Sequence, residues 1–256
     1  MPSYRGLIPG VFTMGNVVCG FLSILSAFEG HVTAACWFVI LAGVLDVLDG
    51  RAARMAGATS QFGVELDSLA DFLSFGVAPA VLVYSIRLNS LGKLGLIISI
   101  MYIMAAAYRL ARYNIMADTE EKKDFVGMPV PLAAFGLVSY VIFSYNLWNG
   151  LQYDEVLVTM IAVFSFVMVS QIQYETMPET FATHWDRMKA AALVVAAICL
   201  AFRPRLLLFP IVVAYILFGL GREGYRLFYV GVGKVTGRPY GRRKTDRRID
   251  DDAEEQ

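Results

Sequence analysis

The stretch LDVLDGRAARMAGATSQFGVELDSLAD, residues 45–71, carries five acids and two arginines inside a chain that is otherwise mostly apolar. Four of the acids are regularly spaced: Asp46 and Asp49 are three residues apart, and Asp67 and Asp71 are four apart. Residues three or four apart share one face of a helix, with Cβ atoms about 5–6 Å from each other. A Gly-Ala-Thr-Ser segment between the two pairs has the composition of a turn. The spacing predicts two antiparallel helices whose paired carboxylates face each other.

The composition places these helices in a membrane. Hydrophobic residues make up 57% of the 256 residues and charged residues 17%, whereas soluble domains are about 45–50% apolar and about a quarter charged. Residues 6–28, 126–153 and 156–174 contain no Asp, Glu, Lys or Arg. Runs of about 20 apolar residues match the thickness of a bilayer core when they are helical. We therefore expect an all-α, multi-pass transmembrane helical bundle, and no motif indicates binding to nucleic acid.

About eight apolar spans can be drawn within a transmembrane domain of residues 1–222. They cover residues 11–29, 31–48, 65–87, 91–112, 128–148, 155–174, 188–203 and 206–222. The last two are short and are joined at Pro204, so they form either a tight hairpin of spanning helices or a re-entrant pair. Residues 223–256 are a charged tail with almost nothing to bury, which we expect to be disordered and cytoplasmic.

The distribution of basic residues predicts the orientation. If the N-terminus is cytoplasmic, the eight spans place eighteen of the 22 Lys and Arg residues on the cytoplasmic side. Cytoplasmic loops carry an excess of Lys and Arg. We expect an integral protein of the inner (cytoplasmic) membrane, with both termini in the cytoplasm and the four aspartates at the cytoplasmic membrane edge.

The crowded aspartates need a compensating charge. Each Asp within a membrane helix costs roughly 2.5–3.5 kcal/mol, and Arg54 alone cannot neutralise four acids. Divalent cations can, because hard ions such as Mg²⁺ take carboxylate oxygens and keep positions open for phosphate. Two ions about 3.5–4 Å apart would form the clamp used for in-line displacement at phosphorus. The alternative is a set of solvated acids paired with Arg51 and Arg54.

The stretch reads D-x2-D-G-x2-A-R-x8-G-x3-D-x3-D, which resembles the signature of the CDP-alcohol phosphotransferase family. The residues at the fixed positions are Asp46, Asp49, Gly50, Ala53, Arg54, Gly63, Asp67 and Asp71. The resemblance implies an integral membrane enzyme, typically a homodimer, that transfers a phosphatidyl group from a CDP-linked lipid to an alcohol and releases CMP.

The resemblance also assigns roles to these residues. Asp46, Asp49 and Asp67 would bind divalent metal, Mg²⁺ or Mn²⁺ and expected as two ions. Asp71 would approach the metal and serve as the catalytic general base. The positions that would line the CDP-lipid site are Asp49, Gly50, Ala53, Arg54 and Gly63, with Ser60 where some members touch the diphosphate.

Three further stretches resemble the serine-accepting bacterial members of the family. In IPGVFTMGNVVCG, residues 8–20, Pro9, Thr13 and Asn16 match positions that help to form the nucleotide pocket, whereas Gly10 replaces the usual Asn. The segments YRLARYN, residues 108–114, and FVGMPVP, residues 125–131, are also similar. The resemblance implies CDP-diacylglycerol as the donor and L-serine as the acceptor.

Arg109 and Arg112 are three residues apart at the end of the fourth span, so either could grip the serine carboxylate. Both could instead anchor the helix at lipid headgroups. Other open alternatives are a different acceptor (glycerol 3-phosphate, inositol or choline), an archaeal CDP-lipid donor, and, outside enzymes, a cation transporter.

Overall fold

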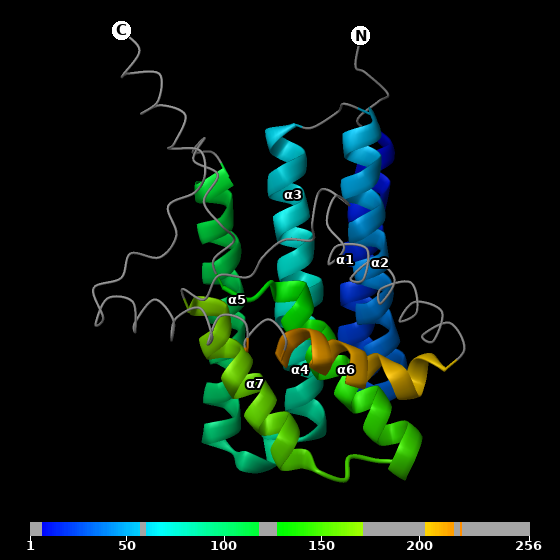
Figure 1. The fold of residues 1–256 in the computed structure, drawn as a ribbon, viewed down its shortest axis with the longest axis vertical. Coiled ribbons are helices and arrows are strands. Elements are labelled where there is room, and N and C mark those ends of the chain that lie inside the picture. The colour runs from blue at the N-terminus through cyan, green and yellow to red at the C-terminus, as the bar shows by residue number, and fades with distance from the viewer. Residues whose placement is uncertain (1–6, 57–59, 118–126, 171–202, 218–220, 222–256) are drawn as a thin grey trace, which may run out of the picture. The chain divides into compact units, whose positions relative to one another are not determined.

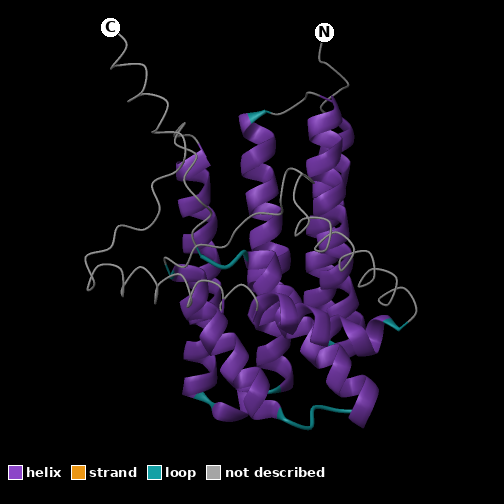
Figure 2. Ribbon diagram, viewed as in Figure 1, coloured by secondary structure: helices purple, strands orange, loops and turns teal. Residues whose placement is uncertain are grey.

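The structure is a computed structural model in which every described element is a helix (Figure 2). The described ranges are 7–56, 60–117, 127–170, 203–217 and residue 221. The chain divides into two compact units, Met1–Tyr215 and Ile216–Gln256. Nearly all of the second unit, including the predicted tail at 223–256, lies outside the described ranges, so the fold below is that of the first unit.

The described elements are helices, labelled in chain order (Figure 1). They are α1 (Leu7–Phe28), α2 (Val32–Ala56), α3 (Gln61–Asp71), the π-helix η2 (Phe72–Val77), α4 (Ala78–Ile86), the 3-10 helix η3 (Leu88–Leu91), α5 (Lys93–Ala117), α6 (Val130–Trp148) and α7 (Asp154–Val169).

Among the described residues, five helical segments are long and apolar enough to cross a membrane. They are Gly10–Phe28, Val32–Ala52, Gln61–Ile86, Lys93–Ile115 and Val130–Trp148. They correspond to the first five predicted spans, and the all-helical membrane class is confirmed. The sixth appears as α7, which has 16 residues, and the eighth as the shorter apolar helix Pro204–Leu217. The predicted seventh span, 188–203, falls almost wholly outside the described residues, so the count of eight remains a prediction.

Around the acidic stretch the helices extend beyond the predicted apolar spans, and they end and begin on either side of the turn predicted at residues 57–60. The second helix continues past residue 48 to Ala56, and the next begins at Gln61 rather than at residue 65. Ser60 accounts for the early start of α3, because its side chain accepts a hydrogen bond from the Gly63 N–H (3.1 Å) and caps the first turn. All four aspartates therefore lie in helices, with Asp71 the last residue of α3 before the helical winding changes in η2.

The first two helices pack together along their length as an antiparallel hairpin. The turn between them ends α1 with Gly30 at φ +78°, where the N–H of His31 reaches back to the Ser26 carbonyl (2.8 Å). Glycine adopts this left-handed conformation without a Cβ clash, which is why it commonly follows a helix. Further from this turn, the two helices are joined by the Ser23 hydroxyl, which donates to the Ala35 carbonyl (2.9 Å). The hairpin presents one side of α1 to α3, η2 and α4.

The remaining helices close around this hairpin. α2 packs on α6 where Gly43 leaves room for the Phe135 ring; a Cβ at Gly43 would lie 2.2 Å from the ring tip. Phe135 also meets Phe75 of η2 edge-on, with ring centroids 5.9 Å apart. α5 packs against α4, η2 and α7. The core is thus centred on η2, the segment that directly follows Asp71.

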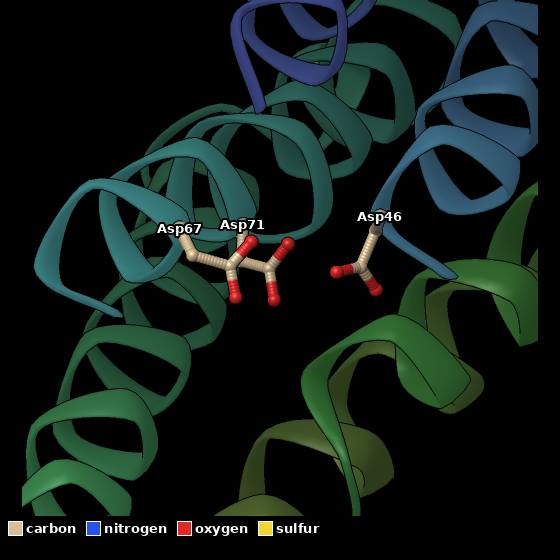
Figure 3. Close-up of side chains that lie close together, drawn as sticks. All are labelled: Asp46, Asp67 and Asp71. Carbon is tan, nitrogen blue, oxygen red and sulfur yellow. The ribbon is translucent and has the colours of Figure 1, made fainter. Parts of the chain in front are cut away.

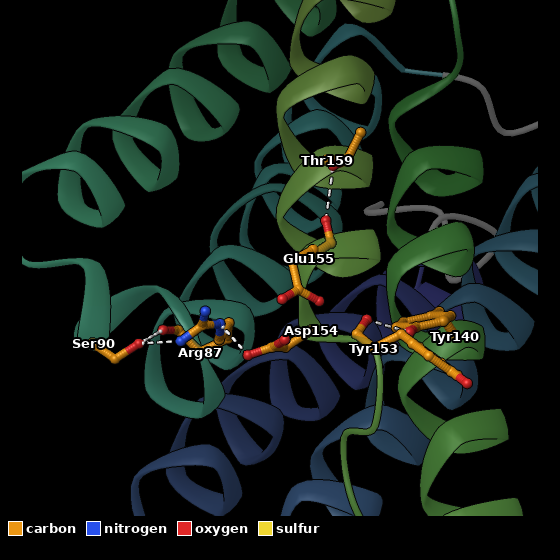
Figure 4. Close-up of polar contacts among 7 residues, drawn as sticks. All are labelled: Arg87, Ser90, Tyr140, Tyr153, Asp154, Glu155 and Thr159. Carbon is orange, nitrogen blue, oxygen red and sulfur yellow. Dashed lines mark hydrogen bonds and ion pairs between the residues drawn. The ribbon is translucent and has the colours of Figure 1, made fainter.

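A polar cluster joins the end of α4 to the start of α7 (Figure 4). Arg87 forms an ion pair with Asp154, Nε to Oδ2 at 2.5 Å, and its Nη1 donates to Ser90 (2.6 Å). The Tyr140 hydroxyl donates to the Tyr153 carbonyl next to this pair. These contacts fix the connections α4–α5 and α6–α7 to each other.

Candidate active site

Three of the four aspartates lie close together between α2 and α3. Asp67 and Asp71, one turn apart on α3, point across a gap at Asp46 on α2 (Figure 3). Each side chain offers a carboxylate oxygen, and these three oxygens all lie within 4.8 Å of one another. All three residues are half-buried. α2 and α3 run in opposite directions (Figure 1), so the start of α3 lies beside the end of α2. This arrangement brings Asp67 and Asp71 of α3 to Asp46 of α2.

Asp49 lies outside this group of three and has its own partner. It is buried, and one of its oxygens accepts a hydrogen bond from the Thr13 hydroxyl of α1. Its other oxygen, Oδ1, is buried without a hydrogen-bond partner among the described residues. A buried carboxylate oxygen left in this state is costly unless a donor or a cation reaches it. Asp49 therefore has one oxygen held by the protein and one available to a ligand.

Asp71 is held by α1 as well. The side-chain amide of Asn16, which is fully buried, donates from Nδ2 to Asp71 Oδ1 (3.1 Å). The amide oxygen of Asn16 has no partner within the described part of the chain. The family resemblance predicts that Thr13 and Asn16 face a nucleotide. The structure adds that they bond to Asp49 and Asp71, which the sequence did not indicate. The available signal was their spacing of three residues on a helix without charged residues.

Among the described residues, no base forms an ion pair with these four acids. The ion pairs found among the described residues join Glu29 to His31 and Asp154 to Arg87. Arg51 and Arg54, the expected partners in the alternative reading, are both exposed and form no ion pair with the aspartates in the described residues. A set of converging carboxylate oxygens without bases is the donor set that divalent cations such as Mg²⁺ prefer. The residues present therefore fit a divalent metal.

The remaining residues of the motif lie at the ends of α2 and α3 nearest the connection between them. A Cβ at Gly50 would come within 3.7 Å of the Arg54 guanidinium, so this glycine leaves space beside the arginine. A Cβ at Gly63 would lie 3.2 Å from the hydroxyl of Ser60, which is the cap of α3. Ala53 and Pro9 lie on α2 and α1, but their side chains are outside the described part of the structure.

The two arginines of α5 have different surroundings. Arg109 is only 7% exposed, and its Nε has no hydrogen-bond partner among the described residues. Arg112 reaches the end of α7, where its Nη1 donates to the Val169 carbonyl (3.4 Å). A cation at a helix C-terminus is stabilised by the carbonyls there. Arg112 therefore has a structural contact, whereas Arg109 is buried with donor capacity to spare.

A polar link between α3 and α5 was also not anticipated. Asn114 of α5 bonds to Ser68 of α3 in both directions, with its Nδ2 at 3.0 Å from the Ser68 hydroxyl. Its amide also lies 3.5 Å from Glu65. Ser68 follows Asp67 directly, so this link holds the turn of α3 that carries the acids.

Comparison with known proteins agrees with this geometry. Residues 6–167 match the family described as CDP-alcohol phosphatidyltransferase. The chain is 35% identical over 219 residues to a CDP-diacylglycerol–serine O-phosphatidyltransferase of Helicobacter pylori, covering 84% of this chain and 90% of that protein. It is 36% identical over 167 residues to the enzyme of the same name from Bacillus subtilis, covering 65% and 89%. An archaetidylserine synthase of Methanothermobacter thermautotrophicus is 34% identical over 170 residues, covering 65% and 69%.

Proposed function

Because this chain belongs to the CDP-alcohol phosphatidyltransferase family, we propose that it transfers the phosphatidyl group of CDP-diacylglycerol to L-serine, giving phosphatidylserine and CMP. The observation that carries the proposal is the convergence of Asp46, Asp67 and Asp71 without a neutralising base among the described residues. Relatives named for the serine reaction match most of the chain, which supports serine as the acceptor.

The four aspartates would hold the divalent metal, Mg²⁺ or Mn²⁺, as two ions. The metal would supply charge neutralisation at the diphosphate of the CDP-lipid. Asp46, Asp67 and Asp71 bring three oxygens within 4.8 Å of one another, and Asp49 adds its unpartnered Oδ1. Thr13 and Asn16 fix the rotamers of Asp49 and Asp71, so the ligand oxygens are oriented before substrate arrives.

In the proposed reaction, the serine hydroxyl oxygen attacks the phosphorus of the phosphatidyl group. The bond from that phosphorus to the CMP oxygen breaks, and CMP leaves with the electron pair. Asp71 takes the hydroxyl proton as general base, with the Asn16 amide holding its other oxygen. With its carboxylate held in this way, Asp71 would not have to change rotamer to take the proton from the serine hydroxyl.

We assign binding of the CDP-lipid to the motif residues that surround the acids. The set is Pro9, Thr13, Asn16, Asp49, Gly50, Ala53, Arg54, Ser60 and Gly63. The amide oxygen of Asn16 has no hydrogen-bond partner in the part of the chain that the structure describes, so it can accept from a nucleotide amine. The exposed guanidinium of Arg54 can donate to a phosphate. Both support this assignment.

For the serine carboxylate, Arg109 is the stronger candidate of the two arginines. Its side chain is buried, and its Nε lacks a hydrogen-bond partner among the described residues. Arg112 already contacts the end of α7. A guanidinium can bind a carboxylate through two parallel hydrogen bonds, which would place the serine hydroxyl near the proposed base.

In the membrane we propose eight spans, an inner-membrane location with both termini cytoplasmic, and a homodimer. The excess of Lys and Arg on the predicted cytoplasmic side supports this orientation. It places the acidic site at the cytoplasmic edge, where soluble serine and the released CMP have access.

The same phosphatidyl-type transfer could use another acceptor alcohol or an archaeal CDP-lipid donor. The archaetidylserine synthase among the relatives favours serine as acceptor but leaves the lipid donor open. Purified enzyme with Mg²⁺ or Mn²⁺ should be incubated with CDP-diacylglycerol and, in separate reactions, labelled serine, glycerol 3-phosphate, inositol or choline. We expect CMP release with serine alone. CMP release with another alcohol but not with serine would refute the acceptor, and metal-dependent ion flux without CMP formation would favour a cation transporter.

A further inference from the structure

The helix that carries Asp67 and Asp71 changes its winding directly after Asp71. Residues 72–77 form the π-helix η2, inside the apolar segment Gln61–Ile86. The N–H of Ala78 donates to the Leu73 carbonyl five residues earlier, the hydrogen bond that defines a π turn. A π turn contains one extra residue, and each residue of an α-helix advances about 100° around the axis. The turn therefore rotates the acidic face of α3 relative to the buried face of α4.

The sequence gives a local reason for this turn. Pro79 lies in the first turn of α4, four residues after Phe75. In a regular α-helix its N–H would bond to the Phe75 carbonyl, but proline has no N–H and its ring collides with the carbonyl four residues earlier. Widening the helix to a π turn relieves that collision. The Phe75 carbonyl is then left without its α-helical donor.

Tyr102 supplies a donor to this carbonyl from another helix. Its hydroxyl, on α5, donates to the Phe75 carbonyl oxygen at 3.1 Å, and both side chains are fully buried. One turn further along α5, the Ala106 methyl would lie 3.2 Å from a Cβ at Gly76, so the two segments are in close contact. A buried carbonyl without a partner is costly, and the tyrosine hydroxyl supplies the hydrogen bond that Pro79 cannot.

The opposite side of η2 is fixed to α1. The Ser74 hydroxyl donates to the backbone carbonyl of Asn16 (2.9 Å), and the side chain of the same Asn16 donates to Asp71. Gly20 makes this contact possible, because a Cβ there would lie 2.4 Å from the Ser74 oxygen. The π turn is thus held between α1 and α5, and its α1 contact point is the residue that orients Asp71.

We propose that Tyr102 is a positioning residue for the metal-binding acids: its hydroxyl holds the π turn at Phe75, and the turn sets the rotation at which Asp67 and Asp71 face Asp46. Tyr102 contacts none of these acids itself. The proposal rests on the proposed function, because it explains how the fold aims the carboxylates that the reaction uses. It predicts an effect on metal binding that is transmitted through the backbone of η2.

The test is the binding of Mn²⁺ to purified protein in detergent, measured by electron paramagnetic resonance without substrate. In Tyr102→Phe, which removes only the hydroxyl, we expect the Mn²⁺ dissociation constant to rise about threefold to tenfold. We expect kcat to fall in parallel and the KM for serine to stay unchanged. The matched control is Tyr140→Phe, because Tyr140 is also buried and donates to a backbone carbonyl, that of Tyr153, away from the acids. The control should bind Mn²⁺ like the wild type.

A second background shows whether the tyrosine acts through Phe75. In Pro79→Ala the residue regains an N–H that can reach the Phe75 carbonyl, so the hydroxyl of Tyr102 is no longer needed there. We expect Tyr102→Phe to change Mn²⁺ affinity less than about twofold in that background, a non-additivity that marks coupled residues. An equal loss in both backgrounds would overturn the proposal, as would wild-type affinity in Tyr102→Phe.

If Tyr102→Phe does not fold, Ser74→Ala tests the proposal instead, because it removes the hydrogen bond that holds the π turn to α1. Weaker Mn²⁺ binding in Ser74→Ala supports the proposal, and unchanged binding refutes it. The failure of the proposed function has a different signature. A wild-type protein that binds no Mn²⁺, or that binds it and forms no phosphatidylserine, would refute the proposed function whatever Tyr102 does.

Discussion

Asn16 of α1 and Asp71 of α3 are joined by a hydrogen bond of 3.1 Å between residues 55 positions apart in the sequence. A carboxylate oxygen of Asp71 also lies within 4.8 Å of one from Asp46 and one from Asp67 (Figure 3). The bond shows that α1 takes part in orienting the acids although it carries no acid in its own sequence.

Replacing Asn16 by Ala should slow the reaction. A hydrogen bond to a charged group contributes about 1.5–3 kcal/mol, so we expect kcat to fall about tenfold to a hundredfold as Asp71 loses its fixed orientation. The measurement is CMP release at saturating serine and CDP-diacylglycerol. Ser23→Ala is the control, because Ser23 is equally buried on the same helix and bonds to the Ala35 carbonyl instead. Equal activity loss in both variants would contradict a specific role for Asn16.

Replacing Asp67 by Asn should stabilise the protein without metal and abolish its response to metal. Removing one of three crowded negative charges relieves their repulsion. In EDTA we therefore expect Asp67→Asn to melt about 2 °C or more above the wild type. Added Mg²⁺ should raise the melting temperature of the wild type but not that of Asp67→Asn, because a ligand that binds the folded state stabilises it. Glu29→Gln, an exposed acid in another ion pair, should respond to Mg²⁺ like the wild type. A Mg²⁺ response retained in Asp67→Asn would show that the metal binds elsewhere.

Replacing Gly20 by Ala should force α1 away from η2. The added Cβ would lie 2.4 Å from the Ser74 hydroxyl and 3.0 Å from its Cα, and the backbone atom cannot rotate away. Overpacking of this kind typically costs about 1–3 kcal/mol, so we expect a lower melting temperature and weaker activity together. Gly10→Ala is the control for stability, because nothing lies within 4 Å of a Cβ at that position. If both variants melt alike, the contact between Gly20 and Ser74 is not a tight one.

The two arginines of α5 should separate in kinetics. Arg109→Ala should raise the KM for serine about tenfold or more, since a charged hydrogen bond is lost, and should leave the KM for CDP-diacylglycerol little changed. Arg112→Ala should mainly lower thermal stability through loss of its bond to Val169. An unchanged serine KM in Arg109→Ala would remove the proposed carboxylate site.

The ion pair between Arg87 and Asp154 should matter little for catalysis (Figure 4). Both side chains are more than a quarter exposed, and such pairs contribute about 0–1 kcal/mol. A double-mutant cycle with Arg87→Ala and Asp154→Ala should therefore give a coupling energy below about 1 kcal/mol in thermal unfolding, with kcat unchanged. A larger coupling would show that the pair is shielded from water.

The acidic motif predicted much of the site because its information is local. The spacing of Asp46, Asp67 and Asp71 put them on helix faces, and the short connection made two helices antiparallel, which the structure shows. The apolar spans are shorter than the helices, because hydropathy falls before a helix stops, whereas the predicted turn at residues 57–60 lies between the end of α2 and the start of α3. The structure adds that Ser60, in this turn, caps α3.

The amino-acid sequence by itself determined the helical membrane class, the place of the acids and the family, because periodicity, hydropathy and motif spacing depend on residues close together in the chain. Tertiary structure alone decided that Thr13 holds Asp49 and that Asn16 holds Asp71. It also decided that Arg109 is buried, whereas Arg112 bonds to α7, and that Tyr102 meets the π turn. These contacts join residues on different helices, and their geometry is set by how the helices pack: a glycine at position 20 or 76 allows an approach that neither sequence segment specifies alone.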